Sequence, residues 1–132
     1  MIVTSDIYKI LYKKVQDFGI EGVYDGWNPI NSQLVDEVIV IVTSTPIEPD
    51  TYWEKAIVHV NICVPDYLGQ TNTVRLNELE RLANLWIKDK PVDEYDGSYY
   101  RISKSSLGIE RDDELKCSYV NVKLLFEILN VK

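Results

Sequence analysis

The chain has 132 residues, of which 14 are basic and 21 acidic, so its net charge is −7 with the single histidine neutral. The length predicts a single domain covering residues 1–132, and a hydrophobic content of 45% excludes intrinsic disorder over most of it. The acidic balance also disfavours a general nucleic-acid binder, because binding the phosphate backbone requires a basic surface.

The first predicted element is a helix from Asp6 to Phe18, in which apolar residues recur every three or four positions. Ser5 or Asp6 can cap its start, and Gly19 stands where a left-handed C-terminal cap is expected. A turn-rich segment follows, with an additional strand considered near Val23-Tyr24. The β-branched run from residue 37 to 43 then predicts a strand buried on both faces or nearly so.

The middle of the chain has the clearest pattern. Apolar residues alternate strictly from Ala56 to Val64, which predicts a half-buried strand with its valine face inward. Leucines at helical spacing then predict a second helix, from residue 72 or 73 to residue 86 or 87. Asn72 and Thr73 offer side-chain oxygens for its N-terminal cap.

The last third of the chain predicts two more strands. Asp96-Gly97 is typical of a tight hairpin turn, and Tyr99–Lys104 is the strand expected after it. A polar stretch at 110–114 precedes the final element, Tyr119–Ile128. Its residues could form a helical stripe, but the long alternation and high β-branched content favour a strand.

This order of elements predicts an α+β fold. We expect a mainly antiparallel sheet of four to five strands with two helices packed on one face. Two helices of modest length cannot cover both faces of such a sheet. One sheet face, or a sheet edge, should therefore be open to partners.

The residues that usually perform catalysis are few and poorly placed. His59 and Cys63 are four residues apart on one predicted strand, about 13 Å, which is too far for direct proton transfer. Cys63 and Cys117 each lie in an apolar, strand-like run, which favours small buried residues over metal ligands or a disulfide. The acidic residues at 93–96 lack the spacing of a calcium loop. We predict no enzymatic activity, no metal and no cofactor.

Neither a membrane span nor a secretory signal is predicted. The apolar runs are far shorter than the roughly 20 residues that a bilayer-spanning helix requires. Residues 1–6 have neither a basic region nor an apolar one, as a secretory signal would. We expect a protein with no membrane contact that stays in the compartment where it is made.

Aromatic residues outside the periodic elements are the candidate contact residues. Tryptophan and tyrosine are enriched at the centres of protein interfaces, whereas Trp86 simply belongs to the core face of the second helix. Any one of these residues could instead fold back over its own core. The candidate subunit interface consists of Trp27, Pro29, Tyr52, Trp53 and Tyr67.

The order of elements resembles that of tail terminator, or tail-completion, proteins of tailed bacteriophages and their head–tail connector relatives. The resemblance covers nearly the whole chain, from the helix Asp6–Phe18 and the segment YDGWNP at 24–29 to the closing strand Tyr119–Ile128. Its centre is the alternating strand followed by a helix, VHVNICVPDYLGQTNTVRLNELERLANLW at 58–86. The likeness lies in order and pattern rather than in diagnostic residues.

The resemblance implies a structural protein of a phage or prophage virion, assembled in the host cytoplasm. Its subunits would close into a homomeric ring at the head–tail junction, next to portal, connector or tail proteins. DNA would pass through the ring without specific binding, and an acidic lumen would favour that passage. Segments Thr45–Glu54 and Leu107–Leu115 are long and polar enough to serve as arms between subunits.

Two other functions stay open. The first is a small monomeric adaptor or ligand-binding module that binds a peptide or small ligand on an open sheet face around His59 and Asn61. The second, and least favoured, is a metal-dependent enzyme that would use the aspartates at 93, 96, 112 and 113.

Overall fold

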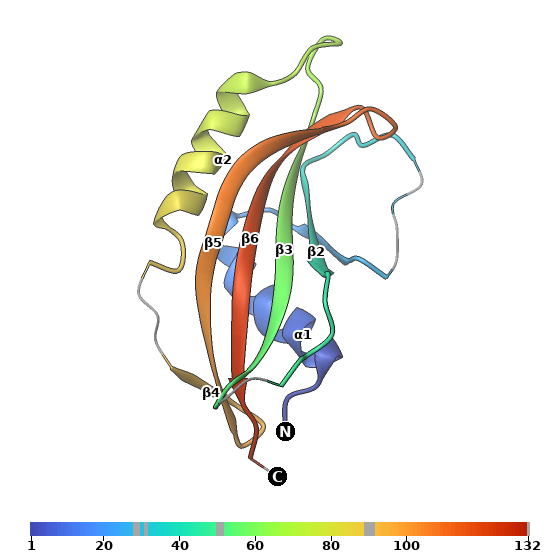
Figure 1. The fold of residues 1–132 in the computed structure, drawn as a ribbon. Helices are drawn as coiled ribbons and strands as arrows, with labels where there is room; N and C mark the ends of the chain where they lie inside the picture. Colours follow the sequence, from blue (N-terminus) through green and yellow to red (C-terminus); the bar gives the residue numbers. More distant parts are fainter. Residues whose placement is uncertain (28–29, 31, 50–51, 89–91, 132) are drawn as a thin grey trace.

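A computed structural model describes residues 1–27, 30, 32–49, 52–88 and 92–131 (Figure 1). The protein is α+β, with two α-helices, a short 3-10 helix and one curled, six-stranded sheet. In chain order the elements are α1 (Thr4–Lys14), η1 (Val15–Phe18), β1 (Gly22–Asp25), β2 (Val38–Thr43), β3 (Glu54–Pro65), α2 (Thr73–Leu85), β4 (Asp93–Tyr95), β5 (Ser98–Asp112) and β6 (Cys117–Leu129).

The sheet is larger and more mixed than the sequence predicts. Its strand order is β1-β2-β3-β6-β5-β4, and β1 runs parallel to β2 while the other neighbouring pairs are antiparallel. The prediction of four to five mainly antiparallel strands is corrected to six strands in a mixed sheet. The parallel pair arises because the segment between Asp25 and Val38 returns the chain to the end of the sheet from which β1 began.

Strands β3 and β6 form the centre of the sheet. They pair from Glu54 opposite Ile128 to Pro65 opposite Cys117. The predicted alternation of β3 is confirmed, and the last element is a strand as predicted. Inward-facing side chains of both strands are buried and join one core cluster with residues of both helices: Ala56, Val58, Val60, Ile62, Val64, Val120, Val122, Leu124, Phe126 and Ile128.

Both helices cover the inward face of the sheet and meet at their C-terminal ends. The Trp86 ring packs edge-on against Phe18, with ring centres 5.0 Å apart. The Trp86 indole N–H also donates to the Lys14 carbonyl oxygen at 3.2 Å. Trp86 is therefore a core residue, as its helical spacing predicts.

The helix ends agree with the sequence except at the start of α1. That helix begins at Thr4, so Asp6 lies within its first turn and accepts a hydrogen bond from the Val3 N–H at 2.9 Å. The prediction that Ser5 or Asp6 precedes the helix is wrong. Gly19 has a φ of 70°, as the predicted left-handed cap requires. Asn72 caps α2 by accepting from the Arg75 N–H at 3.2 Å.

Strand β5 is much longer than the predicted Tyr99–Lys104. A register shift between Lys104 and Ser106 interrupts its alternation, and beyond it the chain stays paired with β6 as far as Asp112. The predicted arm Leu107–Leu115 is therefore the far end of the β5–β6 hairpin, which Figure 1 shows bending over the top of the molecule. The predicted Asp96-Gly97 turn is confirmed, with φ of 49° and 76°.

The other predicted arm, Thr45–Glu54, is also tied to its own chain where it is described. The Ser44 N–H donates to the Ile57 carbonyl oxygen at 3.0 Å, and Glu48 and Lys55 exchange backbone hydrogen bonds of 2.8 Å. As far as Glu48 the segment therefore continues the pairing of β2 with β3 rather than extending from the molecule.

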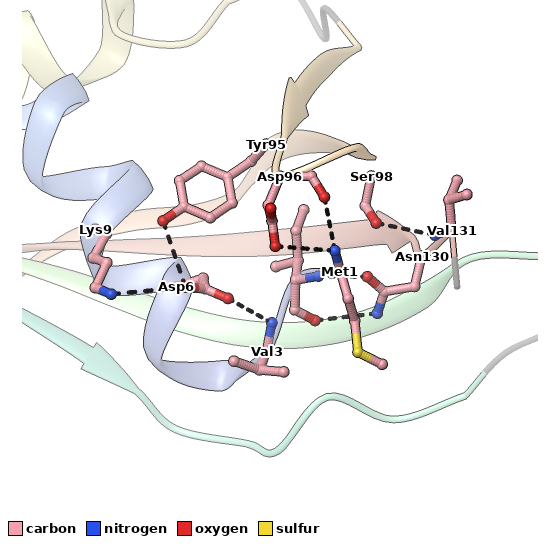
Figure 2. Close-up of polar contacts among 10 residues, drawn as sticks. Met1, Val3, Asp6, Lys9, Tyr95, Asp96, Ser98, Asn130 and Val131 are labelled. Atoms are coloured by element: carbon pink, nitrogen blue, oxygen red, sulfur yellow. Dashed lines mark hydrogen bonds and ion pairs between the residues drawn. The ribbon is translucent and has the colours of Figure 1, made fainter.

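The two chain ends close the lower end of the fold (Figures 1 and 2). The Met1 ammonium group donates to the Asp96 carbonyl oxygen at 2.8 Å and lies 3.3 Å from the Asp96 carboxylate. Asn130 accepts from the Ile2 N–H at 2.6 Å and donates to the Ile2 carbonyl oxygen at 3.1 Å. These contacts join α1 to the β4–β5 turn and to the end of β6.

The buried side of α2 gives a test of the core. We expect Leu79→Ala to lower the free energy of unfolding by about 2–5 kcal/mol, because Leu79 is fully buried between helix and sheet. The matched control is Leu85→Ala on the same helix, where the side chain is 61% exposed and the expected change is within about 0.5 kcal/mol. Urea unfolding followed by circular dichroism measures both, and equal losses would contradict this packing.

Candidate interaction surfaces

The face of the sheet turned away from the helices carries a polar cluster. We call it the outer face; on β3 and β6 it presents Ile57, His59, Asn61, Asn121, Lys123 and Leu125, all partly exposed. The Asn121 side-chain nitrogen donates to Asn61 Oδ1 at 2.7 Å and lies 3.1 Å from His59 Nδ1. The cluster can offer amide and imidazole groups to a ligand.

One end of the outer face is covered by the segment between β1 and β2. Leu34 and Val38 pack there against Cys63 and Cys117 in a second buried cluster, with Leu115 and Tyr119 at its margin. The Leu34 N–H donates to the Leu115 carbonyl oxygen at 3.2 Å, which holds the segment on the hairpin. A cleft of about 260 Å³ opens beside this cluster.

Both cysteines are buried free thiols. Burial, together with the neighbouring Cys117 thiol, raises the pKa of Cys63 to about 12. Burial also raises the pKa of Cys117. A thiol with a raised pKa carries little thiolate and is a poor nucleophile. The interpretation of both residues as small buried side chains is confirmed.

The predicted interface residues lie in separate places and differ in exposure. Tyr52, Tyr67 and Trp27 are 82%, 67% and 55% exposed, so their rings are available for contact. Pro29 lies outside the described residues. Tyr52 and Tyr67 lie beyond opposite ends of β3, so the described residues do not form one patch, and their role at a subunit interface stays a prediction.

Trp53 differs from the other predicted interface residues because it packs on its own chain. The guanidinium of Arg101 lies 4.4 Å from the centre of the Trp53 ring. Arg101 in turn forms two hydrogen bonds with Glu127, of 3.1 and 3.2 Å. Trp53 therefore belongs to a three-residue stack on the outer face, and only part of its surface can contact a partner.

A tight turn between β3 and α2 presents an apolar tip. Tyr67 and Gln70 exchange backbone hydrogen bonds of 2.8 and 3.0 Å around Leu68-Gly69, and both central residues have positive φ. Leu68 is the more exposed of the two apolar side chains at this tip. The sequence analysis did not identify Leu68 as a candidate contact residue. Its position before a glycine, just after a predicted strand, could have indicated an exposed turn.

A larger groove, of about 760 Å³, lies between α1 and β4. Tyrosines and lysines line it, but several of their polar atoms are already engaged. The Tyr100 hydroxyl donates to the Asp93 carboxylate at 3.1 Å, and the Lys14 ammonium lies 5.7 Å from the Tyr100 ring centre. Burial and the Asp93 carboxylate raise the pKa of Tyr100. These interactions across the groove therefore help to hold α1 against the sheet.

The aspartates of the metal-enzyme hypothesis are not brought together. Asp93 and Asp96 lie at one end of β5, and Asp112 and Asp113 lie at the other. The 15 residues of β5 separate the two pairs, a distance of about 50 Å along the chain. Among the described residues, no three histidine, cysteine or acidic side chains are grouped so that they could hold a metal ion.

No family model matches the chain, and no curated protein matches it. A solved structure whose name states no function is similar to it, with a TM-score of 0.52 and 14% sequence identity over 98% of both chains. At that identity the likeness shows a shared fold alone. Neither helix, within the part of the chain that is described, has the length and apolarity to cross a membrane.

The buried thiols give a second test. At about pH 8, a pKa of about 12 leaves roughly one Cys63 side chain in ten thousand as thiolate. We expect the folded protein to react with a thiol reagent only as fast as it unfolds. In guanidinium chloride both thiols should react at once, which is the control. Rapid labelling of either cysteine in the folded protein would contradict the burial of this cluster.

Proposed function

We propose that the protein is a structural subunit of a phage or prophage particle, which forms a homomeric ring at the head–tail junction. Its partners are then further copies of itself and the neighbouring portal, connector or tail proteins, and its location is the virion. The order of helices and strands on which the resemblance rests supports this proposal.

The placement of exposed tyrosines carries the proposal. Tyr52 precedes the first residue of β3, and Tyr67 follows the last. A strand of twelve residues spans about 40 Å, so the two side chains are at opposite ends of the long axis of the sheet. A ring that lies between two other assemblies needs a contact surface at each end. Exposed tyrosines suit that role, because they bury a large area at low entropic cost.

Charge supports the passage of DNA through such a ring. Each chain carries a net charge of −7, and closing several copies into a ring multiplies that charge. Binding to DNA depends on basic groups that displace counterions from the phosphates. A ring with an acidic lumen would hold DNA weakly and let it move.

The outer face favours a second candidate function, a monomeric adaptor. The cluster of His59, Asn61 and Asn121 lies on a half-exposed surface, on the side of the sheet away from α1 and α2. Amide side chains that contact one another across two strands could exchange those contacts for hydrogen bonds to a peptide or small ligand.

The ring is tested by the mass of the purified protein. We expect light scattering after size exclusion, with negative-stain images, to show closed rings at high protein concentration. Trp27→Ala should weaken each contact between copies by about 2 kcal/mol, roughly thirtyfold, if Trp27 lies at the interface. The sequence predicts Tyr52 and Tyr67 at the interface between copies, but this proposal assigns them to the two ends of the ring. Tyr52→Ala and Tyr67→Ala should therefore leave the ring intact and reduce the joining of tails to heads.

The control is Val35→Ala, which shortens another highly exposed apolar side chain outside the predicted interface. Unchanged assembly and tail joining in all three aromatic variants would count against these contacts. A protein that stays monomeric at the highest attainable concentration would favour the adaptor.

A further inference from the structure

The solvent side of α2 carries two large apolar side chains. Leu76, Leu79 and Ala83 form the buried side of the helix. On the opposite side Val74 and Leu85 are 72% and 61% exposed, although the outward face of an amphipathic helix is normally polar. Both residues lie outside the two buried clusters, so the packing of the chain itself does not explain them.

Two residues of opposite charge lie between these apolar residues on the same face of the helix. The intervals along the face are four, three and four residues, which is the spacing of a coiled-coil seam. The face carries no net charge, whereas the whole chain carries −7, so two copies repel each other less here than elsewhere. We call this face the α2 stripe, and its residues, all exposed, are Val74, Glu78, Arg81 and Leu85.

Both charged groups of the α2 stripe keep unused hydrogen-bonding capacity. Arg81 donates from Nε to Asn77 Oδ1 at 3.0 Å, and within the described part of the chain its two terminal nitrogens bond nothing. Glu78 accepts at Oε2 from the Arg75 guanidinium at 3.2 Å, and no described residue donates to its Oε1. Each group can therefore form an ion pair with a group of opposite charge on another molecule.

The helix that carries the stripe is fixed at both ends. Asn72 caps its start, and at its end the Lys104 ammonium donates to the carbonyl oxygens of Ala83 and Asn84, at 3.0 and 2.6 Å. Figure 1 shows α2 along one flank of the molecule, beside β5. A helix held in this way loses little conformational freedom when it binds, which favours its use as a contact surface.

We propose that two copies of the chain pair through the α2 stripe as antiparallel helices, around a two-fold axis at the middle of the stripe. In that register Val74 of each copy faces Leu85 of the other. Glu78 of each copy likewise faces Arg81 of the other. A helix rises 1.5 Å per residue, so the members of each pair lie at the same height along the helix axes. The two-fold symmetry forms each pair twice.

The order of residues in the stripe selects a second copy as the partner. Reversing the direction of the helix exchanges Val74 with Leu85. It also exchanges Glu78 with Arg81, so the stripe is complementary to its own reverse in both charge and apolar character. A parallel pair would instead set like charges against each other. The charged residues therefore fix the antiparallel direction, as a polar residue in a coiled-coil seam fixes register, and the apolar pairs supply buried area.

The contact is small and separate from the proposed ring. Because α2 has 13 residues, we expect a weak dimer, with a dissociation constant of about 100 µM. Unfolding measured well below that concentration therefore reports on the monomer. The pairing uses none of Trp27, Tyr52 and Tyr67, and a two-fold contact closes after two copies, so it neither rests on the ring nor forms it.

An exchange of charges tests the pairing. Glu78→Arg places arginine at both central positions of the stripe, and Arg81→Glu places glutamate at both, so each variant alone should dimerise at least tenfold more weakly. Mixed in equal amounts, the two variants should form a heterodimer, because the arginines of one face the glutamates of the other. Sedimentation equilibrium at about 0.1–1 mM should therefore show dimers for the native chain and for the mixture, and monomers for each variant alone.

The matched control for charge is Glu80→Arg. It makes the same change on the same helix, but Glu80 lines the groove between α2 and β5 and lies off the stripe, so the dimer should persist. Leu85→Ala tests the apolar pairs and should weaken the dimer about tenfold, since the side chain is lost from both of them. Far-UV circular dichroism should be the same for every variant, because all these side chains lie outside the buried clusters.

The outcomes separate this proposal from the ring. A native chain that is monomeric up to about 1 mM, or a dimer that persists in Glu78→Arg and Arg81→Glu, overturns the pairing. A mixture of those two variants that stays monomeric, or an equal loss of dimer in Glu80→Arg, also overturns it. A ring of the same mass in Glu78→Arg and in the native chain overturns the pairing and favours the ring. A heterodimer of the two variants, together with dimers that persist in Trp27→Ala, supports the pairing whether or not rings form.

Discussion

The rest of the structure depends on the pairing of β3 with β6. The two strands stay in register from Glu54 to Pro65 and present two parallel rows of apolar side chains to one face. Burying those rows requires a second layer, which only the helices can supply. The positions of α1 and α2, and the contact of Trp86 with Phe18, follow from that requirement. Strands β2 and β5 then extend a sheet whose inner face is already defined.

Elements whose pattern is uninterrupted were predictable from the sequence. The alternation of β3 and β6 and the Asn72 cap of α2 are local properties, and each was confirmed. The far half of β5 was not predictable, because the register shift after Lys104 moves the apolar side chains to the other parity. The parallel pairing of β1 depends on the path of a loop, which no local pattern records.

The candidate contact residues also divide into features that the local sequence predicts and features that depend on distant parts of the chain. A tryptophan in a loop can either contact another chain or pack on its own chain. Which of the two occurs depends on the residues that the fold brings next to its ring. Trp53 has Arg101 as its partner, far along the chain, whereas Trp27 keeps more than half of its surface exposed. The sequence predicts only that one sheet face or one sheet edge is left unpaired, and it does not identify the far half of β5 as that edge. Its position depends on where β4 ends, and β4 is three residues long.

The two edges of the sheet are protected in different ways. Proteins protect an edge strand by keeping it short, by covering it, or by placing lysine or proline on it. Strand β1 is short and has Tyr8 beside it, whereas β5 has a register shift after Lys104 and charged side chains at Lys104 and Arg111. A bulge and charged side chains limit the pairing of an edge strand with another chain. Both edges of the sheet are therefore protected, β1 by its short length and its neighbour Tyr8, and β5 by its bulge and its charged residues.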